Sequence, residues 1–376
     1  MTLLKFELLK ILKNKFYYLG ILILLILFTY PLFIYPDNEK IYENNINQLE
    51  ANIDMSRNAI ISNGDNSNTE EINKIIEEDI QLQQQLLLAY QNQDNQKIIE
   101  GRLEFDKNNL DGLINGTLAG TSVTEVKKDI GINEYLLKHN LERIEPYAIQ
   151  VPAINYLYSL TSTVIPFKII LLMLGLMLGS IFTNEKRNNN INVLNALPIN
   201  LYKISLLKVV TATAFVILTL IVPFIIIFLI IASIYGVGDL NYPMAYSFDL
   251  NTVEVTTLTT YIVKYFLLSI LSIILIGLIS YLLSLFTGNI MFLVMILVVI
   301  IFIADPNLKN SDVLTTYAHI LPTTYFNVQD ILLGQVENNP LPNFLVTYQN
   351  GLITLLVSII FVSFLIFTTL FFKKKL

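Results

Sequence analysis

Six long runs of apolar residues constrain this chain more than any other feature of its sequence. They cover residues 16–35, 164–182, 209–235, 261–286, 290–304 and 352–372. A helix rises about 1.5 Å per residue, so about 20 apolar residues cross the hydrocarbon core of a bilayer. Hydrophobic residues make up 54% of the chain and charged residues only 14%, which excludes a soluble domain of this length. The sequence therefore predicts an all-α polytopic membrane protein with six transmembrane helices.

Basic residues divide the chain between the two sides of the membrane. The segments 1–15, 184–208 and 373–376 carry eleven Lys and Arg residues and only two acidic residues. Short loops rich in Lys and Arg stay on the cytoplasmic side. An even number of spans also places both chain ends on one side, in agreement with these charges. We therefore expect cytoplasmic termini and a cytoplasmic loop over residues 184–208.

The largest polar segment, residues 36–160, lies between the first and second spans and is expected outside the cell. It holds ten basic and twenty-one acidic residues, a net charge of −11. Apolar residues recur at helical spacing over 41–60 and again over 72–87, with a turn between them, which predicts a helical hairpin. Another helix is expected after Ser122, which has the form of a capping box with Glu125, and a break near Gly131. Residues 112–120 are rich in Gly and predict a loop.

This large helical extracellular domain is compatible with three uses. It can form a gate or funnel for an exported substrate, a receptor surface for an extracellular peptide, or a spacer across a thick wall. Its negative charge would attract cationic peptides by long-range steering, although a solvated acidic helix surface is the commoner meaning of such a charge.

Shorter segments complete the expected topology. Residues 1–15 have the pattern of an interfacial amphipathic helix on the inner leaflet, and a plain basic stop before the first span fits equally well. Residues 236–260 form a short outer loop, and residues 305–350 a third outer segment. In the second span, Gly175, Gly179 and Ser180 include a G-x-x-x-G pattern that permits close helix approach, within the chain or at a dimer interface.

Several kinds of chemistry find no support in the sequence. There is no G-x-x-x-x-G-K-[ST] phosphate loop, so ATP hydrolysis by that route would need another subunit. With no Cys and only two His residues, the chain lacks the ligands of a usual zinc site. An ion-coupled transporter usually keeps an acidic residue deep in a span, whereas the charges inside these runs are Lys168 and Lys264, both near span ends. We therefore expect no catalytic, cofactor or metal residues, no nucleic acid, and a driving force from outside the chain.

The central loop carries the most informative pattern. Its apolar residues Ile191, Val193, Leu194 and Leu197 have near-helical spacing, and Pro198 ends the helix. Together with Glu185, Arg187 and Lys203, between two long spans, they resemble the cytoplasmic loop of ABC-2-type permeases. The chain departs from the family pattern in having Asn189-Asn190, where Gly-Thr is common, and Asn200.

The resemblance implies the membrane subunit of a bacterial ABC exporter. It implies two ATP-binding partner subunits that hold ATP and Mg and dock on the central loop, and a second permease copy or paralogue in the lipid bilayer. It also implies re-entrant helical elements in residues 305–350, before the last span. Without the resemblance, the same residues fit an amphipathic outer loop that rests on the membrane surface. Amphipathic or antimicrobial peptides, lipid-like molecules and drugs are the expected substrates. A non-transporting sensor or immunity protein, or a sodium-ion efflux permease of the same family, is the alternative.

Overall fold

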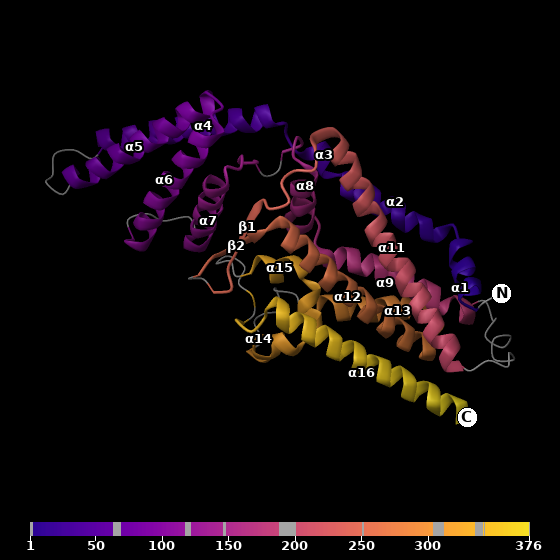
Figure 1. Cartoon of the computed structure of the whole chain (residues 1–376). Helices are drawn as coiled ribbons and strands as arrows, with labels where there is room; N and C mark the ends of the chain where they lie inside the picture. The colour runs from indigo at the N-terminus through magenta and orange to yellow at the C-terminus, as the bar shows by residue number, and fades with distance from the viewer. Residues whose placement is uncertain are drawn as a thin grey trace.

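The computed structural model describes residues 3–62, 69–116, 122–145, 148–187, 201–249, 252–303, 312–334, 341 and 343–375 (Figure 1). These residues form an apolar helix bundle and, at one end of it, a separate group of polar helices. Both chain termini lie at the opposite end of the bundle, where α1 (Leu3–Leu12) is also found (Figure 1).

Within the described residues, five helical segments are long and apolar enough to cross a membrane. They are α2 (Phe16–Thr29) with its continuation α3 (Pro31–Ile34), α9 (Phe167–Arg187), α11 (Leu201–Tyr235), α12 (Leu258–Phe286) and α16 (Tyr348–Lys375). At 1.5 Å per residue, the 35 residues of α11 extend about 52 Å, well beyond a hydrocarbon core of about 30 Å. The prediction of a largely α-helical chain with several membrane-crossing helices is confirmed in this form.

The expected fifth span, residues 290–304, corresponds to the short helix α13, and residue 304 lies outside the described residues. Its helix α13 (Ile290–Phe302) has 13 residues, or about 20 Å, which is too short to cross a hydrocarbon core alone. Leu293, Leu297 and Ile301, one turn apart, are fully buried, and α13 packs along α9. Met291, Phe292, Met295 and Val299 on its other face are exposed. The described residues therefore hold five helices that are long enough to cross a membrane and a sixth, shorter apolar helix that packs on them with one face.

The polar helical domain consists of α4 (Asn38–Ser62), α5 (Thr69–Gln91), α6 (Asn95–Ile114) and α7 (Val123–His139) (Figure 1). The two helices of the expected hairpin are α4 and α5, and the cap at Ser122 is confirmed, because its Oγ accepts a hydrogen bond from the Glu125 N–H at 3.3 Å. The prediction of a break at Gly131 is wrong, because α7 continues through this residue. The expected loop over 112–120 is also wrong at its start, because α6 continues to Ile114. The sequence also has the form of a capping box at Ser67 with Glu70, and Ser67 lies outside the described residues.

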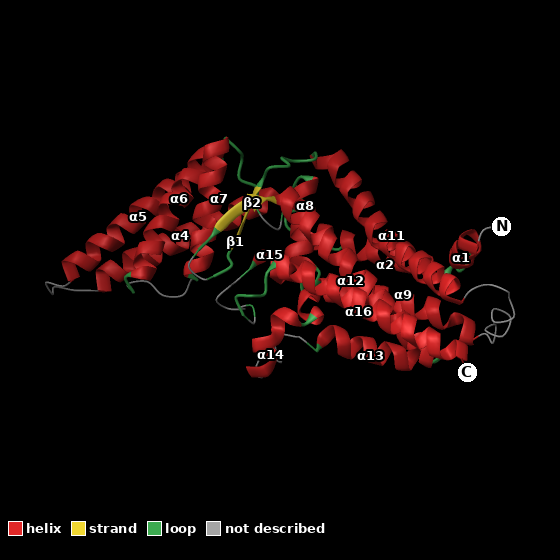
Figure 2. Ribbon diagram, turned by 60° about the horizontal axis from the view of Figure 1, so that its bottom comes forward, coloured by secondary structure: helices red, strands yellow, loops and turns green. Residues whose placement is uncertain are grey.

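Two features of the junction between this domain and the bundle were not expected from the sequence. Residues 236–260, predicted as a loop, contain an antiparallel ribbon of β1 (Pro243–Tyr246) and β2 (Glu254–Thr257), with Met244 opposite Thr256 (Figure 2). The ribbon packs on α7, where a side chain at Gly131 would meet Val255 at 3.0 Å. This contact explains why a glycine occurs in the middle of a continuous helix. The bundle then begins with α8 (Ala153–Ser159) and a π-helical turn, Leu160–Val164.

The segment before the last span is folded into the bundle. It contains α14 (Asp312–Tyr317), the 3₁₀ turns Ala318–Ile320 and Pro322–Phe326, and α15 (Val328–Leu333). Tyr325 and Phe326 are fully buried. Gln329 Oε1 accepts a hydrogen bond at 3.2 Å from the first N–H of α9, that of Phe167, and Lys128 of α7 donates to the Leu333 carbonyl at 3.1 Å. The segment thus lies between the polar helical domain and α9, and its buried rings do not fit a loop that only rests on a surface.

Candidate functional site

Basic residues from four elements gather at the end of the bundle that holds the two termini. We call this the basic end; it comprises α1, the last turn of α9, the first turns of α11 and the end of α16 (Figure 1). Helix α1 packs beside α11 through Glu7 and Ile11, both 3% exposed. Leu4 and Leu12, in contrast, are exposed. An exposed apolar face on a short helix beside a span suits a position at the membrane surface.

Lysines at the basic end stabilise helix ends. Lys186 donates a hydrogen bond to the Leu285 carbonyl at 2.8 Å, in the last turn of α12, where carbonyls have no partner within the helix. Lys208 is buried, and its Nζ lies 3.5 Å from the Phe182 carbonyl in α9. The turn between α12 and α13 packs directly on Lys186, since a side chain at Gly288 would meet it at 3.1 Å. Consequently α9, α11 and α12 are fixed to one another at this end.

The residues expected to receive an ATPase are only partly described. Glu185 and Arg187 lie in the last turn of α9, and the Arg187 guanidinium donates to Asn184 Oδ1 at 3.2 Å. Lys203 lies exposed in the first turn of α11. The other expected contact residues lie outside the described residues: Ile191, Val193, Leu194, Leu197 and Pro198. The predicted loop 184–208 is thereby shortened, because helices occupy both of its ends.

The G-x-x-x-G glycines pack within the chain. A side chain at Gly179 would meet Leu293 of α13 at 2.7 Å, and one at Gly175 would meet Ile276 of α12 at 3.3 Å. Ser180 is buried beside them. Close approach of α9 to α12 and α13 therefore accounts for both glycines within one copy of the chain.

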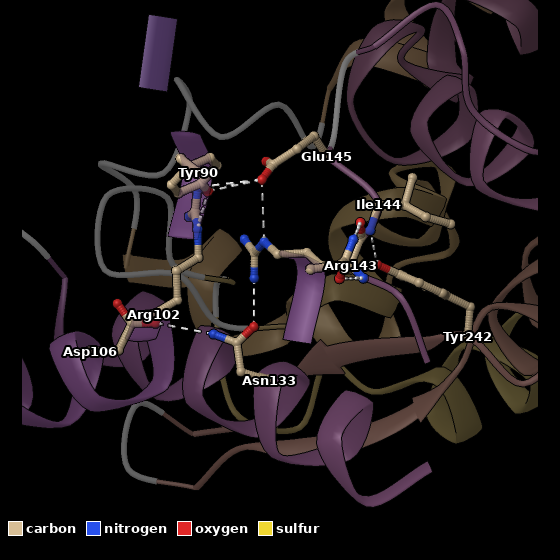
Figure 3. Close-up of polar contacts among 9 residues, drawn as sticks. Tyr90, Arg102, Asp106, Asn133, Arg143, Ile144, Glu145 and Tyr242 are labelled. Carbon is tan, nitrogen blue, oxygen red and sulfur yellow. Dashed lines mark hydrogen bonds and ion pairs between the residues drawn. The ribbon is translucent and has the colours of Figure 1, made fainter. Parts of the chain in front are cut away.

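A second candidate site is the polar network inside the helical domain (Figure 3). Its centre is Glu145, whose Oε1 lies 3.5 Å from Arg102 Nη2 and 3.6 Å from Arg143 Nε and accepts a hydrogen bond from the Tyr90 hydroxyl at 3.1 Å. Arg102 also donates from Nε to the Tyr90 oxygen at 2.6 Å. One nearly buried carboxylate thus balances two arginines from different parts of the sequence.

The backbone on either side of Arg143 is held as firmly as its side chain. Arg143 Nη1 donates to Asn133 Oδ1 at 2.6 Å, and its peptide N–H donates to Asn95 Oδ1 at 2.8 Å. The next N–H, that of Ile144, donates to the hydroxyl of Tyr242 at 2.9 Å, just before β1. The segment 143–145 therefore connects α6 and α7 to the ribbon at the top of the bundle.

Burial changes the pKa values of the groups in this network. It raises the pKa of Tyr90 to about 12, so this phenol keeps its proton at neutral pH and remains a donor to Glu145. Burial, together with the nearby Asp129, raises the pKa of Asp106 to about 6. The pKa of Asp129 is also raised, again mainly by burial. Two carboxyl groups beside the arginines are therefore easier to protonate than ordinary aspartates.

Sequence reasoning missed this network. It counted Arg102, Arg143 and Glu145 only toward the net charge of the domain, because their partners lie far apart in the chain. The closely spaced Arg143 and Glu145 before Pro146 were the only local signal. Within the described part of the chain, no group of three or more His, Asp or Glu side chains is arranged to hold a metal ion.

No family model matches the chain, and neither the curated proteins nor the solved structures include a match to it.

Proposed function

We propose that this chain is the membrane-spanning permease subunit of an ATP-driven ABC exporter in a bacterial cell membrane. Both termini would lie in the cytoplasm and the polar helical domain outside. Two separate ATPase subunits would dock on residues 184–208 and on α1, and a second permease copy or a paralogue would complete the transporter. ATP and Mg would bind to those partners, and amphipathic or antimicrobial peptides, lipid-like molecules or drugs would be the substrates.

The observation that carries this proposal is the opposition between the basic end and the polar helical domain (Figure 1). Lys and Arg residues from the two termini, α9 and α11 collect at one end of the bundle, and the acidic helices α4–α7 lie at the other. Positively charged short segments remain in the cytoplasm. The same end presents α1 and both flanks of the central loop, so one partner can contact all of them.

The fixed helix ends add mechanical support to the proposal. Lys186 joins α9 to the end of α12, and Lys208 joins α11 to α9. A force applied by an ATPase between residues 187 and 201 would therefore act on three membrane helices together. ATP binding would rock these helices and switch access to a central pathway.

The orientation is tested with single cysteines, because the natural chain has none. Asn195→Cys should react with a membrane-impermeant maleimide only after cell lysis. Glu104→Cys, exposed in α6, is the matched control and should react in intact cells. Labelling of Asn195→Cys in intact cells would overturn the orientation and with it the docking site.

The partner is tested by co-purification. A tagged chain should bring down an ATPase, and Leu194→Glu with Leu197→Glu should abolish that association. The exposed Lys107→Glu substitution in the polar helical domain should leave it intact. Normal expression of the double variant, together with unchanged ATPase recovery, would favour the sensor or immunity reading.

A further inference from the structure

A cavity of about 230 Å³ lies where the polar helical domain meets the bundle. Its walls come from α7, from residues 143–145 and 148–151, from α8 and the π-helical turn, and from the start of β1. The volume is below the range of about 300–1,000 Å³ that is usual for drug-sized ligands. An occupant must therefore be compact, of the size of one amino-acid side chain or one small head group.

Aromatic rings form much of the wall. Tyr35, Tyr158 and Tyr242 line the cavity, together with hydroxyl groups such as that of Ser159. The Tyr35 and Ser159 oxygens are 3.4 Å apart, and the Tyr242 hydroxyl is already used by the Ile144 N–H. The tyrosines consequently offer ring surface to an occupant, and the face of an aromatic ring attracts cations.

One carboxylate in the wall has no ion-pair partner within 4 Å among the described residues, and Arg143 and Arg102 act on it from further away. Arg143 and Glu145 line the cavity but are paired with each other, and Arg143 is also held by Asn133. Asp129 faces the same space, and among the described residues no ion pair or hydrogen bond engages its carboxylate. With Arg102 and Asp106 behind them, these five charged groups carry a net charge of −1 when all are ionised. The charge left for an occupant to balance is negative.

We infer that this cavity binds a compact organic cation, an ammonium or guanidinium group. Asp129 balances its charge, and the tyrosine side chains that line the cavity surround it. The group can belong to a Lys or Arg side chain of a peptide, to a free amine or to an aminophospholipid. The inference does not depend on export, because it concerns binding to this chain alone.

The test uses the full chain in nanodiscs of phosphatidylglycerol, without any ATPase. The probe is Nα-acetyl-lysine methylamide, and its uncharged norleucine analogue is the control, both followed by saturation-transfer NMR. Saturable binding of the lysine probe, with at least a tenfold weaker response to the norleucine probe, is the expected result. Equal binding of both probes would overturn the inference.

Two variants localise the binding. Asp129→Asn should weaken lysine-probe binding about tenfold. Glu134→Gln is the matched control, because Glu134 lies on the same helix but is paired with Lys107 away from the cavity, and it should bind as the natural chain does. Unchanged thermal melting must accompany each value, and undiminished binding in a normally folded Asp129→Asn variant would overturn the assignment.

A final arm identifies the source of the cation. Competition by phosphatidylethanolamine included in the nanodiscs would assign the site to a lipid head group. Unchanged probe binding in the presence of that lipid would assign it to a soluble or peptide amine. Because no transport is measured, failure of this experiment leaves the exporter proposal unaffected, and failure of the ATPase experiment leaves this one unaffected.

Discussion

The polar helical domain and the membrane bundle determine their structures by different means. In the domain, helices are positioned by directional polar contacts: Asp94 and Ser122 cap α6 and α7, and Glu145 joins two arginines. In the bundle, the positions of the helices are set by close approach at small residues, as where Gly179 faces Leu293. Burial in lipid supplies no hydrophobic force between helices, so packing must replace it there. The domain, which is wetted by water, can use hydrogen bonds and a small core of its own around Leu49, Tyr90 and Ile98.

The largest effect is expected at the centre of the polar network. Glu145→Ala would leave Arg143 and Arg102, whose side chains are 12% and 28% exposed, without their counter-ion. Removing one partner of a buried ion pair typically costs about 3–5 kcal/mol. Denaturant unfolding of the full chain in detergent, followed by proteolysis of α4–α7, should show a loss of this size in the domain. A loss below about 1 kcal/mol would mean that polar contacts do not organise it.

The bundle is tested by adding one methyl group. Gly179→Ala would bring a Cβ within 2.7 Å of Leu293 and should destabilise the folded chain by about 1–3 kcal/mol through overpacking. Gly175→Ala, one turn earlier, meets its nearest neighbour at 3.3 Å. There the gain in helix propensity, about 1 kcal/mol, should offset the contact. Equal melting temperatures for the two variants would contradict the packing argument.

The contribution of Asp106 to the stability of the polar helical domain should depend on pH. The raised pKa of Asp106 means that the folded chain binds more protons than the unfolded chain between about pH 4 and pH 6. The contribution of this group is therefore present at low pH and is lost as the pH rises through its folded pKa. Asp106→Asn should be more stable than the natural chain by about 1–2 kcal/mol at pH 7.5, a value reduced for partial solvent access.

This gain should shrink toward pH 4, where the carboxyl is protonated in the folded chain and partly protonated in the unfolded chain. Thermal melting at pH 4.5, 6 and 7.5 measures it. A constant difference across the three values would show that the pKa of Asp106 is ordinary.

The smallest effect is expected at an exposed pair in the same domain. Lys107 Nζ and Glu134 Oε1 are 2.8 Å apart, but both side chains are 52% exposed. Such pairs contribute about 0–1 kcal/mol, because water and salt screen them. Lys107→Gln should thus change the free energy of unfolding by less than about 0.5 kcal/mol. A larger loss would mean that proximity alone, without burial, stabilises this domain.

The sequence was most informative where one signal dominated. Long apolar runs predicted the five long apolar helices and the shorter α13, and period and capping predicted α4, α5 and the start of α7. It failed where tertiary contacts decide. Helix α6 has no clear apolar stripe, and the break expected at Gly131 is absent because that glycine packs on Val255. The β1–β2 ribbon likewise depends on neighbours that hydropathy does not reveal.

The candidate site was less predictable than the fold. Charge counting found the basic end, because the positions of Lys and Arg along the chain are themselves the signal. It could not find the polar network, whose partners Arg102 and Glu145 meet only after α6 and α7 have packed together. Nor could it distinguish an intramolecular from a dimeric role for Gly175 and Gly179, which required the position of α13.

The short helix α15 gives the molecule a long-distance connection. Lys128 of α7 donates a hydrogen bond to the last carbonyl of α15, and Gln329 within α15 accepts one from the first N–H of α9. Helix α9 then extends through 21 residues, about 32 Å, to Arg187. If α7 tilted while both hydrogen bonds stayed intact, the first turn of α9 would move with it. A movement at either end of α9 would then be transmitted along this helix to its other end.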